Sequence, residues 1–320
     1  MRVFHRIEEV LQAEESNHKR SAVALGNFDG VHAGHAALIR DMLKVAGEMG
    51  SMPSVLTFFP HPVEVLRPGT KLERLTTASE KLAILSSLGV ETVLVAKFDA
   101  ELASLSPEQF FERYLDRGFH ASSVHVGFNF SFGRARAGNI DTLTALCHKS
   151  SIRLQVEQPI TARGQKVSSS RIREFIRVGD VTAASECLGR PYSVSGLVCQ
   201  GDGRGRQLGF ATANLRVAAE KLLPKNGVYV TRAWWQKQPF LSVTNIGVRP
   251  TFARSDELAT HIETHLLDFN SRIYDEEVTI DFLERLRDEA KFASAQSLKS
   301  QIEQDIVAAR ESLSLRSPKG

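Results

Sequence analysis

The sequence predicts two domains: an α/β domain built on a doubly wound parallel sheet, and a small antiparallel β-barrel followed by a C-terminal helix. Over roughly the first 180 residues, short apolar runs alternate with amphipathic stretches, which favours a mostly parallel sheet covered by helices. Beyond Pro191 the runs become strand-like and are separated by turn residues, as in small barrels. At 320 residues the chain is long for one compact domain, and we expect residues 1–187 and 188–320 to form separate domains.

The N-terminal elements follow from apolar periodicity. An apolar series with three- and four-residue spacing, ending at Met49, predicts a helix over 35–50. Ser106, with proline as the next residue and glutamine three residues on, marks another helix start. A further helix is expected at 139–149. Continuous apolar runs predict buried strands at 21–28, 53–59, 92–98, 123–128 and 152–158.

The C-terminal half contains two helical segments and a series of strands. Asp180 is the expected cap of a short helix that ends at Gly189. Helical character returns between Leu286 and Leu313. The expected buried stripe of that helix consists of Phe292, Leu298, Ile302 and Ile306. Strands are expected at 192–200, 227–235, 240–248, 260–269 and 277–283.

The composition is that of an ordinary globular protein, with 40 basic and 37 acidic residues. So large an acidic complement argues against a general polyanion-binding surface, and we expect no nucleic-acid partner. The three cysteines, Cys147, Cys187 and Cys199, are far apart and are expected to be buried thiols of a reducing compartment. No secretory signal and no apolar run of membrane-spanning length is present. We therefore expect a cytoplasmic protein with no membrane partner; a weak homo-oligomer is left open.

The segment GNFDGVHAGH at 26–35 lies where a strand turns into a helix. Its glycines let the backbone approach a ligand closely, and the N-terminus of a helix attracts phosphate. His32 and His35 share one face of a helical turn, from which two imidazoles can stabilise charge on a pentavalent α-phosphoryl group. The alternatives are a pair of surface histidines beside a loop, or a metal site, for which no third ligand is apparent.

Two C-terminal segments carry further chemistry. GDGRGRQLGFATANL at 201–215 combines glycines and arginines in an anion-binding pattern, although a flexible polar turn would have the same composition. HIETHLLDF at 261–269 reads as a strand that places His261, Glu263 and His265 on one face. Glu263 flanked by histidines suits a general base, and a solvated strand face is the alternative.

These N-terminal motifs resemble those of the bacterial bifunctional riboflavin kinase/FAD synthetase family, whose N-terminal domain is a Rossmann-like nucleotidylyltransferase. GNFDGVHAGH is similar to the family's HxGH signature, and TFFPHP, VGFNFSFGRARAG and VSSSRIREFI are similar to its later motifs. The resemblance implies that His32 and His35 are catalytic and that Asn129 contacts the flavin substrate. The residues implied to bind the phosphates of ATP are Gly26, Phe28, Asp29, Gly34, Ser169, Ser170 and Arg173. Ser170 stands where the family often has threonine.

The C-terminal motifs resemble riboflavin kinase, from NGVYV through SVTNIGVRPTF and IETHLLDF to FLERLRDEAKFAS. By that resemblance Glu263 is the catalytic base, Asn245 binds flavin, and Thr212 and Asn214 bind Mg²⁺. The residues implied to bind ATP phosphates here are Gly201, Gly203, Arg206 and Gly209. Ala211 replaces the usual proline of the family's PTAN loop, which removes a fixed φ but keeps both ligand side chains.

The resemblance implies two ATP-dependent reactions that use Mg²⁺. The C-terminal domain would phosphorylate riboflavin to FMN, and the N-terminal domain would transfer AMP to FMN, giving FAD and pyrophosphate. Alternatives are a riboflavin kinase with a degenerate N-terminal site, or a non-catalytic flavin-responsive regulator. HxGH by itself also fits adenylyltransferases acting on pantetheine phosphate or nicotinate mononucleotide, against which the β-rich second domain argues.

Overall fold

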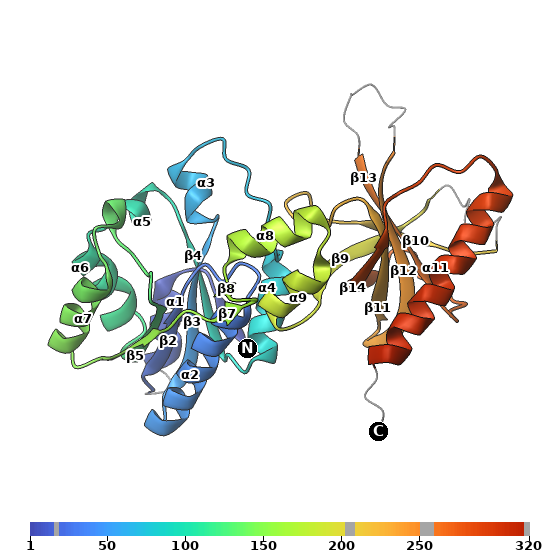
Figure 1. Ribbon diagram of the computed structural model, residues 1–320. Coiled ribbons are helices and arrows are strands. Elements are labelled where there is room, and N and C mark those ends of the chain that lie inside the picture. Colours follow the sequence, from blue (N-terminus) through green and yellow to red (C-terminus); the bar gives the residue numbers. More distant parts are fainter. Residues whose placement is uncertain (16–18, 202–208, 250–258, 317–320) are drawn as a thin grey trace. The chain divides into compact units, whose positions relative to one another are not determined.

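A computed structural model describes residues 1–15, 19–201, 209–249 and 259–316. The chain divides into two compact units, Met1–Ser169 and Ser170–Gly320. The predicted fold class is confirmed in both, because the first unit holds a parallel sheet with helices and the second a closed antiparallel barrel followed by a helix (Figure 1). The predicted boundary between residues 187 and 188 stays a prediction; it falls at the end of the second of two helices, α8 (Ser169–Val178) and α9 (Val181–Leu188).

The first unit is built on a six-stranded parallel sheet with the order β1-β4-β3-β2-β5-β6. The chain runs from the central β2 outward through β3 and β4, and then crosses back to β5 on the other side of β2. The sheet therefore reverses its winding beside β2, the position at which such sheets bind ligands. The strands are β1 (Arg2–Phe4), β2 (Ser21–Leu25), β3 (Met52–Phe59), β4 (Thr92–Lys97), β5 (Ala121–Gly127) and β6 (Arg153–Glu157).

Two apolar clusters cover the two faces of this sheet, which is what a doubly wound sheet requires. One cluster joins the strands to α2 and α4; the other joins them to α1, α5, α6, the π-helix η1 and α7 (Figure 1). The helices are α1 (Ile7–Glu15), α2 (Ala33–Met49), α3 (Pro62–Leu66), α4 (Ala78–Ser87), α5 (Ala100–Ser104), α6 (Pro107–Phe110), η1 (Phe111–Asp116), the short η2 (Arg134–Arg136) and α7 (Ile140–Lys149). A small hairpin, β7 (Thr161–Ala162) and β8 (Gln165–Lys166), follows the sheet.

Most predicted N-terminal elements are confirmed, with three differences. Ser106 caps α6 through the expected capping box, and α2 ends at Gly50, which adopts the left-handed conformation. Met49 is exposed rather than part of the buried stripe, because it is the last residue of α2. Strand β2 ends at Leu25, three residues earlier than predicted, so Gly26–Phe28 belongs to the loop. Several elements were not predicted, among them β1 and the helices α1, α3, α4 and α5.

The second unit contains the closed barrel with the order β10-β13-β12-β11-β14-β9, antiparallel throughout. Its interior includes a fully buried set of hydroxyls in which the Thr244 Oγ1 atom lies 2.8 Å from Thr264 Oγ1 and 2.7 Å from Thr231 Oγ1. The strands are β9 (Tyr192–Cys199), β10 (Ala213–Arg216), β11 (Gly227–Trp235), β12 (Gln238–Arg249), β13 (Ala259–Leu266) and β14 (Glu277–Arg287). Of these, β10 was not predicted as a strand.

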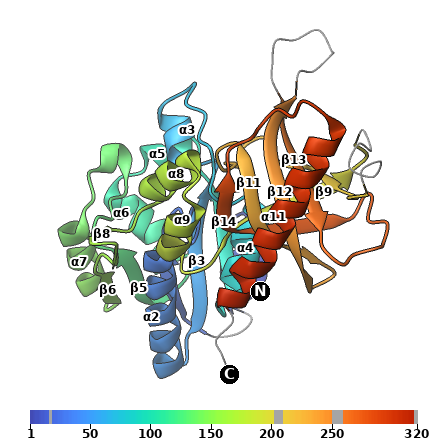
Figure 2. The same ribbon diagram turned by 45° about the vertical axis from the view of Figure 1, so that its right-hand side comes forward.

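The C-terminal helix, α11 (Ala295–Arg316), lies along β11 and β12 on the outside of the barrel (Figure 2). It begins nine residues later than predicted, because β14 continues to Arg287. The strand has irregular register with β11 opposite Leu283 and Leu286. Such bulges put residues three apart on one side of a strand, and both leucines pack against the cluster that α11 covers.

The predicted buried stripe of this helix needs correction. Phe292 precedes the helix, and Leu298, Ile302 and Ile306 are only half-buried. The fully buried positions are Ala309 and Asp305. Asp305 accepts hydrogen bonds from the Arg287 guanidinium at 2.8–3.3 Å, which fixes α11 to β14.

The predicted burial is confirmed for two of the three cysteines. Cys147 and Cys187 are buried, and burial raises the pKa of the Cys147 thiol to about 12. Cys199 is half-buried at the end of β9, where its Sγ atom lies 3.4 Å from the Asn214 carbonyl oxygen.

Candidate functional sites

The Gly26–His35 loop follows β2 directly and leads into α2. Since the strands are parallel, the ends of β2, β3 and β5 lie at one edge of the sheet, which brings three predicted motifs to that edge. They are the loop itself, the Pro60-His61-Pro62 turn after β3, and the segment around Asn129 after β5. Asn129 is exposed in this turn. The loop and the Asn129 turn flank the place where the sheet reverses its winding.

His32 and His35 lie at the first turn of α2, as the spacing predicts. His32 is the N-cap, and its Nδ1 atom accepts a hydrogen bond from the His35 backbone N–H at 3.3 Å. The two rings are stacked with 3.6 Å between centroids, and the edge of Phe28 packs against His35. Gly34 permits this stack, because a Cβ atom there would lie 3.3 Å from the His32 ring. The imidazoles and the first backbone N–H groups of α2 thus lie at the same end of the helix.

The loop has an unusual backbone held by outside contacts. Phe28 and Val31 have φ angles of 50° and 37°, in the left-handed region that is unfavourable for bulky side chains. The buried Asp29 carboxylate accepts hydrogen bonds from the backbone N–H groups of Leu75 and Thr76 at 3.1–3.3 Å. The Gly30 N–H donates to Thr76 Oγ1 at 3.1 Å. Asp29 therefore has an evident role in fixing the loop.

The predicted phosphate residues Ser169, Ser170 and Arg173 lie on the first turns of α8. The Ser169 hydroxyl donates to the Asp29 carbonyl oxygen at 2.9 Å, which joins the start of α8 to the Gly26–His35 loop. Ser170 is exposed and Arg173 is buried. The serine-rich motif is thus the start of a helix, as its residue types indicate.

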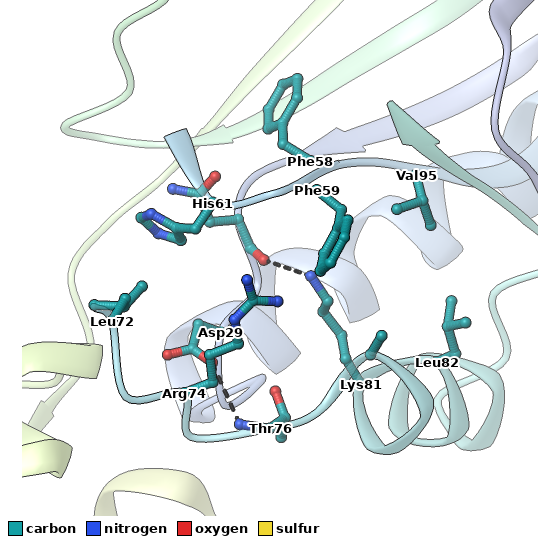
Figure 3. A pocket seen from close by; sticks show the side chains of 12 residues that line it. Asp29, Phe58, Phe59, His61, Leu72, Arg74, Thr76, Lys81, Leu82 and Val95 are labelled. Carbon is teal, nitrogen blue, oxygen red and sulfur yellow. Dashed lines mark hydrogen bonds between the residues drawn. The ribbon is translucent and has the colours of Figure 1, made fainter. Parts of the chain in front are cut away.

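A pocket beside the loop contains residues that sequence reasoning missed. Figure 3 shows Arg74 and Lys81 in this pocket with Asp29, Phe59 and His61. The Arg74 guanidinium lies 4.8 Å from the centre of the Phe59 ring and 2.8 Å from a Glu64 carboxylate oxygen. The Thr77–Glu80 capping box at the start of α4 is the signal that would have found this segment.

In the barrel, strand pairing places three predicted side chains in a row. Glu263 on β13 is directly opposite Asn214 on β10 and Asn245 on β12. Directly opposed residues have their side chains on the same face of the sheet. The next residues along β13, Ile262 and Thr264, are buried on the other face, as the alternation predicted.

The histidines beside Glu263 have separate contacts. The His261 Nε2 and Glu263 Oε1 atoms are 2.6 Å apart, and both side chains are largely shielded from solvent. His265 Nδ1 lies 2.7 Å from the Ala211 carbonyl oxygen, and the His265 ring packs edge-on against Phe210. At this separation His265 holds the turn in which alanine replaces the family's proline.

Asn214 lies directly against Gly201. A Cβ atom at Gly201 would lie 2.1 Å from the Asn214 Nδ2 atom, so only glycine fits there without rearrangement. The buried Asn214 Oδ1 atom has no hydrogen-bond partner among the residues that the structure describes. Thr212 is half-buried two residues earlier, and Gly209 has a φ of 92°. Gly203 and Arg206 lie outside the described residues.

The Asn214 amide oxygen, which has no partner among the described residues, and the hydroxyl of Thr212, two residues earlier in the sequence, are oxygen ligands of the kind that Mg²⁺ prefers. The residues present therefore fit the predicted metal.

Among the described parts of the chain, no helix has the length and apolar character needed to cross a membrane.

The chain thus has two candidate sites: an HxGH pair at the switch point of a parallel sheet, and an Asn–Glu–Asn row in a barrel. Such sites suit an enzyme that transfers phosphoryl or nucleotidyl groups. A model of the FAD synthetase family matches residues 14–171, and a model of the riboflavin kinase family matches residues 188–313. The chain belongs to the family of bifunctional riboflavin kinase/FMN adenylyltransferases.

Individual relatives agree with this assignment. The bifunctional riboflavin kinase/FMN adenylyltransferase of Bacillus subtilis is 37% identical, over 89% of this chain and 90% of the relative. That of Pseudomonas fluorescens is 36% identical, over 92% and 93%, and that of Escherichia coli K12 is 32% identical, over 99% and 100%. A crystal structure described as a macrolide-efflux protein from Streptococcus pneumoniae matches with a TM-score of 0.84 and 32% identity, covering 91% of this chain and 94% of that one.

Proposed function

We propose that residues 188–320 phosphorylate riboflavin to FMN and that residues 1–187 transfer AMP from ATP to FMN, giving FAD and pyrophosphate. The observation that carries this proposal is the presence of both key groups in one chain of this family: the stacked histidine pair at α2 and the Asn–Glu–Asn row in the barrel. Both reactions act on small molecules and need no nucleic-acid or membrane partner, and we place the enzyme in the cytoplasm.

In the adenylyl transfer, a phosphate oxygen of FMN attacks the α-phosphorus of ATP, and pyrophosphate leaves. His32 and His35 donate hydrogen bonds to the phosphoryl oxygens as negative charge builds up on them. The free N–H groups of α2 add to this stabilisation. Asn129 contacts the flavin substrate at the same edge of the sheet.

The remaining predicted residues of this site position ATP. Adenylyl transfer depends mostly on placement and electrostatics. The protein therefore accelerates it mainly by holding the FMN phosphate in line with the α-phosphate of ATP. The residues proposed to hold the ATP phosphates are Gly26, Phe28, Asp29, Gly34, Ser169, Ser170 and Arg173. Asp29 does so through the loop geometry that its backbone contacts maintain.

In the kinase reaction, Glu263 accepts the proton of the riboflavin 5′-hydroxyl as the oxygen attacks the γ-phosphorus of ATP, and ADP leaves. The His261 N–H donates to the Glu263 carboxylate and holds its orientation. Asn245, beside Glu263 in the row, contacts the flavin. The phosphates of ATP are bound by Gly201, Gly203, Arg206 and Gly209.

Thr212 and Asn214 would hold Mg²⁺, which is supported by the Asn214 amide oxygen having no partner among the residues that the structure describes. When bound, the ion neutralises charge on the phosphate oxygens. Gly201 keeps Asn214 in place by leaving room for its side chain.

The test is to incubate the purified chain with riboflavin, ATP and Mg²⁺ and to separate riboflavin, FMN and FAD by chromatography. We expect both products. His32→Ala or His35→Ala should stop FAD formation while FMN accumulates. Glu263→Gln should block FMN formation but leave the conversion of supplied FMN to FAD.

Two outcomes would overturn the proposal. Riboflavin returned unchanged by the folded wild type would indicate a non-catalytic regulator. FMN formation without FAD, even from supplied FMN, would indicate a kinase whose N-terminal site is degenerate.

A further inference from the structure

Lys81 on α4 has no part in the reactions described above, yet its side chain reaches the Gly26–His35 loop. Its Nζ atom donates to the Asn27 carbonyl oxygen at 3.1 Å and lies 3.3 Å from Thr57 Oγ1. The Thr57 hydroxyl donates to the same Asn27 carbonyl at 3.1 Å. One carbonyl at the start of the loop is therefore held by two donors from α4 and β3.

The loop needs such support because its own backbone is unfavourable. Phe28, the residue after Asn27, and Val31 both have left-handed φ angles. A bulky residue is strained in that region, and the conformation persists only when its surroundings impose it. The same segment that supplies Lys81 also supplies the backbone N–H groups that hold Asp29. This one segment thus contacts the loop at Asn27 and Asp29, immediately before His32 and His35.

The environment of Lys81 makes its charge responsive to pH. Burial in the pocket lowers its pKa to about 8, an effect that Asp29 opposes and Arg74 reinforces. The other charged or titratable groups lining the pocket or paired within it are His61 and Glu64, and Glu64 is bound to Arg74. At neutral pH the amine is mostly an ammonium, a stronger donor to the Asn27 carbonyl than the neutral amine.

We propose that Lys81 is a positioning residue for adenylyl transfer, which fixes the Asn27 carbonyl and through it the placement of His32 and His35. This inference rests on the proposed function of the N-terminal site. This role also explains why the pocket holds a buried lysine, since burial of an ammonium group is unfavourable unless hydrogen bonds compensate for the lost hydration.

The test compares Lys81→Met, which removes the donors, with Lys81→Arg, which keeps charge and donors, in the full-length chain. The exposed Lys149 on α7 supplies the matched control, Lys149→Met. The kcat and KM values for FAD formation from supplied FMN and ATP are measured between pH 6.5 and 9.5. The rate of FMN formation from riboflavin by the same preparations reports on the barrel domain.

We expect Lys81→Met to lower the kcat of FAD formation at least tenfold, with the KM values for FMN and ATP changed less than threefold and FMN formation within twofold of wild type. Lys81→Arg should recover at least half of the lost rate. The wild-type rate should decline as the pH rises through about 8, the pKa of Lys81, and the Lys81→Arg rate should not. Lys149→Met should match wild type throughout.

FAD formation by Lys81→Met within twofold of wild type would overturn the inference, as would the same pH decline in wild type and Lys81→Arg. A loss of FMN formation equal to the loss of FAD formation would show general unfolding and overturn it too. If the wild type itself makes no FAD from FMN, the proposed function fails rather than the role of Lys81.

Discussion

Replacing Gly201 by alanine adds one methyl group at a point where the structure has no room for it. The new Cβ atom would lie 2.1 Å from Asn214 Nδ2 and 2.5 Å from Asn214 Cγ. Gly201 does not have a left-handed φ, so the alanine backbone is allowed and the whole effect is steric. Asn214 must rotate or the backbone at Gly201 must move, and overpacking of this kind costs about 1–3 kcal/mol. Either movement displaces the amide oxygen that we assign to Mg²⁺.

Loss of that ligand should lower the rate of FMN formation at least tenfold, which corresponds to about 1.4 kcal/mol in the barrier. The assay is the initial rate of FMN formation from riboflavin as a function of Mg²⁺ concentration, and we expect the half-saturating concentration to rise. Conversion of supplied FMN to FAD by the same preparation should stay within twofold of wild type, because His32 and His35 lie in the other unit.

Gly47→Ala is the matched control for this change. Gly47 lies inside α2, and a Cβ atom there would meet nothing within 4 Å. Alanine is favoured over glycine in a helix interior by roughly 0.5–1 kcal/mol, so this variant should be slightly more stable and fully active. Wild-type FMN formation and unchanged Mg²⁺ dependence in Gly201→Ala would refute the assignment of Asn214.

Three further changes have definite expected outcomes. Asp29→Ala removes the acceptor of the 75–76 backbone N–H groups, and we expect FAD formation to fall at least tenfold while FMN formation persists, as product chromatography would report. Asp305→Ala leaves Arg287 without its partner on α11 and should lower the free energy of unfolding of the barrel by about 2–3 kcal/mol in urea titrations. Burial lowers the pKa of His125 below 6.5, so as the pH falls the unfolded chain takes up a proton before the folded chain does. The free energy of unfolding should therefore fall as the pH drops below about 6.5. In His125→Asn the fall between about pH 7.5 and 5.5 should be weaker.

Sequence patterns predicted the features that depend on local spacing. The strand-to-helix position of Gly26–His35, the capping box at Ser106 and the alternation around Glu263 each involve residues within one element. The C-terminal helix was predicted to begin nine residues too early, because the strand before it continues to Arg287 and the helix begins at Ala295.

The rest depends on long-range pairing that no local pattern encodes. Asn214 and Glu263 are neighbours only because the barrel closes with β10 beside β13. Lys81 reaches Asn27 because α4 packs against the same sheet face as α2. Its sequence surroundings, a weakly amphipathic helix after a polar segment, give no sign of that contact.

The central claim is that each domain carries one of two successive reactions. It is tested most directly by mixing equal amounts of the His32→Ala and Glu263→Gln chains with riboflavin, ATP and Mg²⁺. Neither variant alone should produce FAD from riboflavin. The mixture should produce it, because the first variant makes FMN and the second adenylylates it. A mixture that makes no FAD, although each variant retains its own single reaction, would contradict the account.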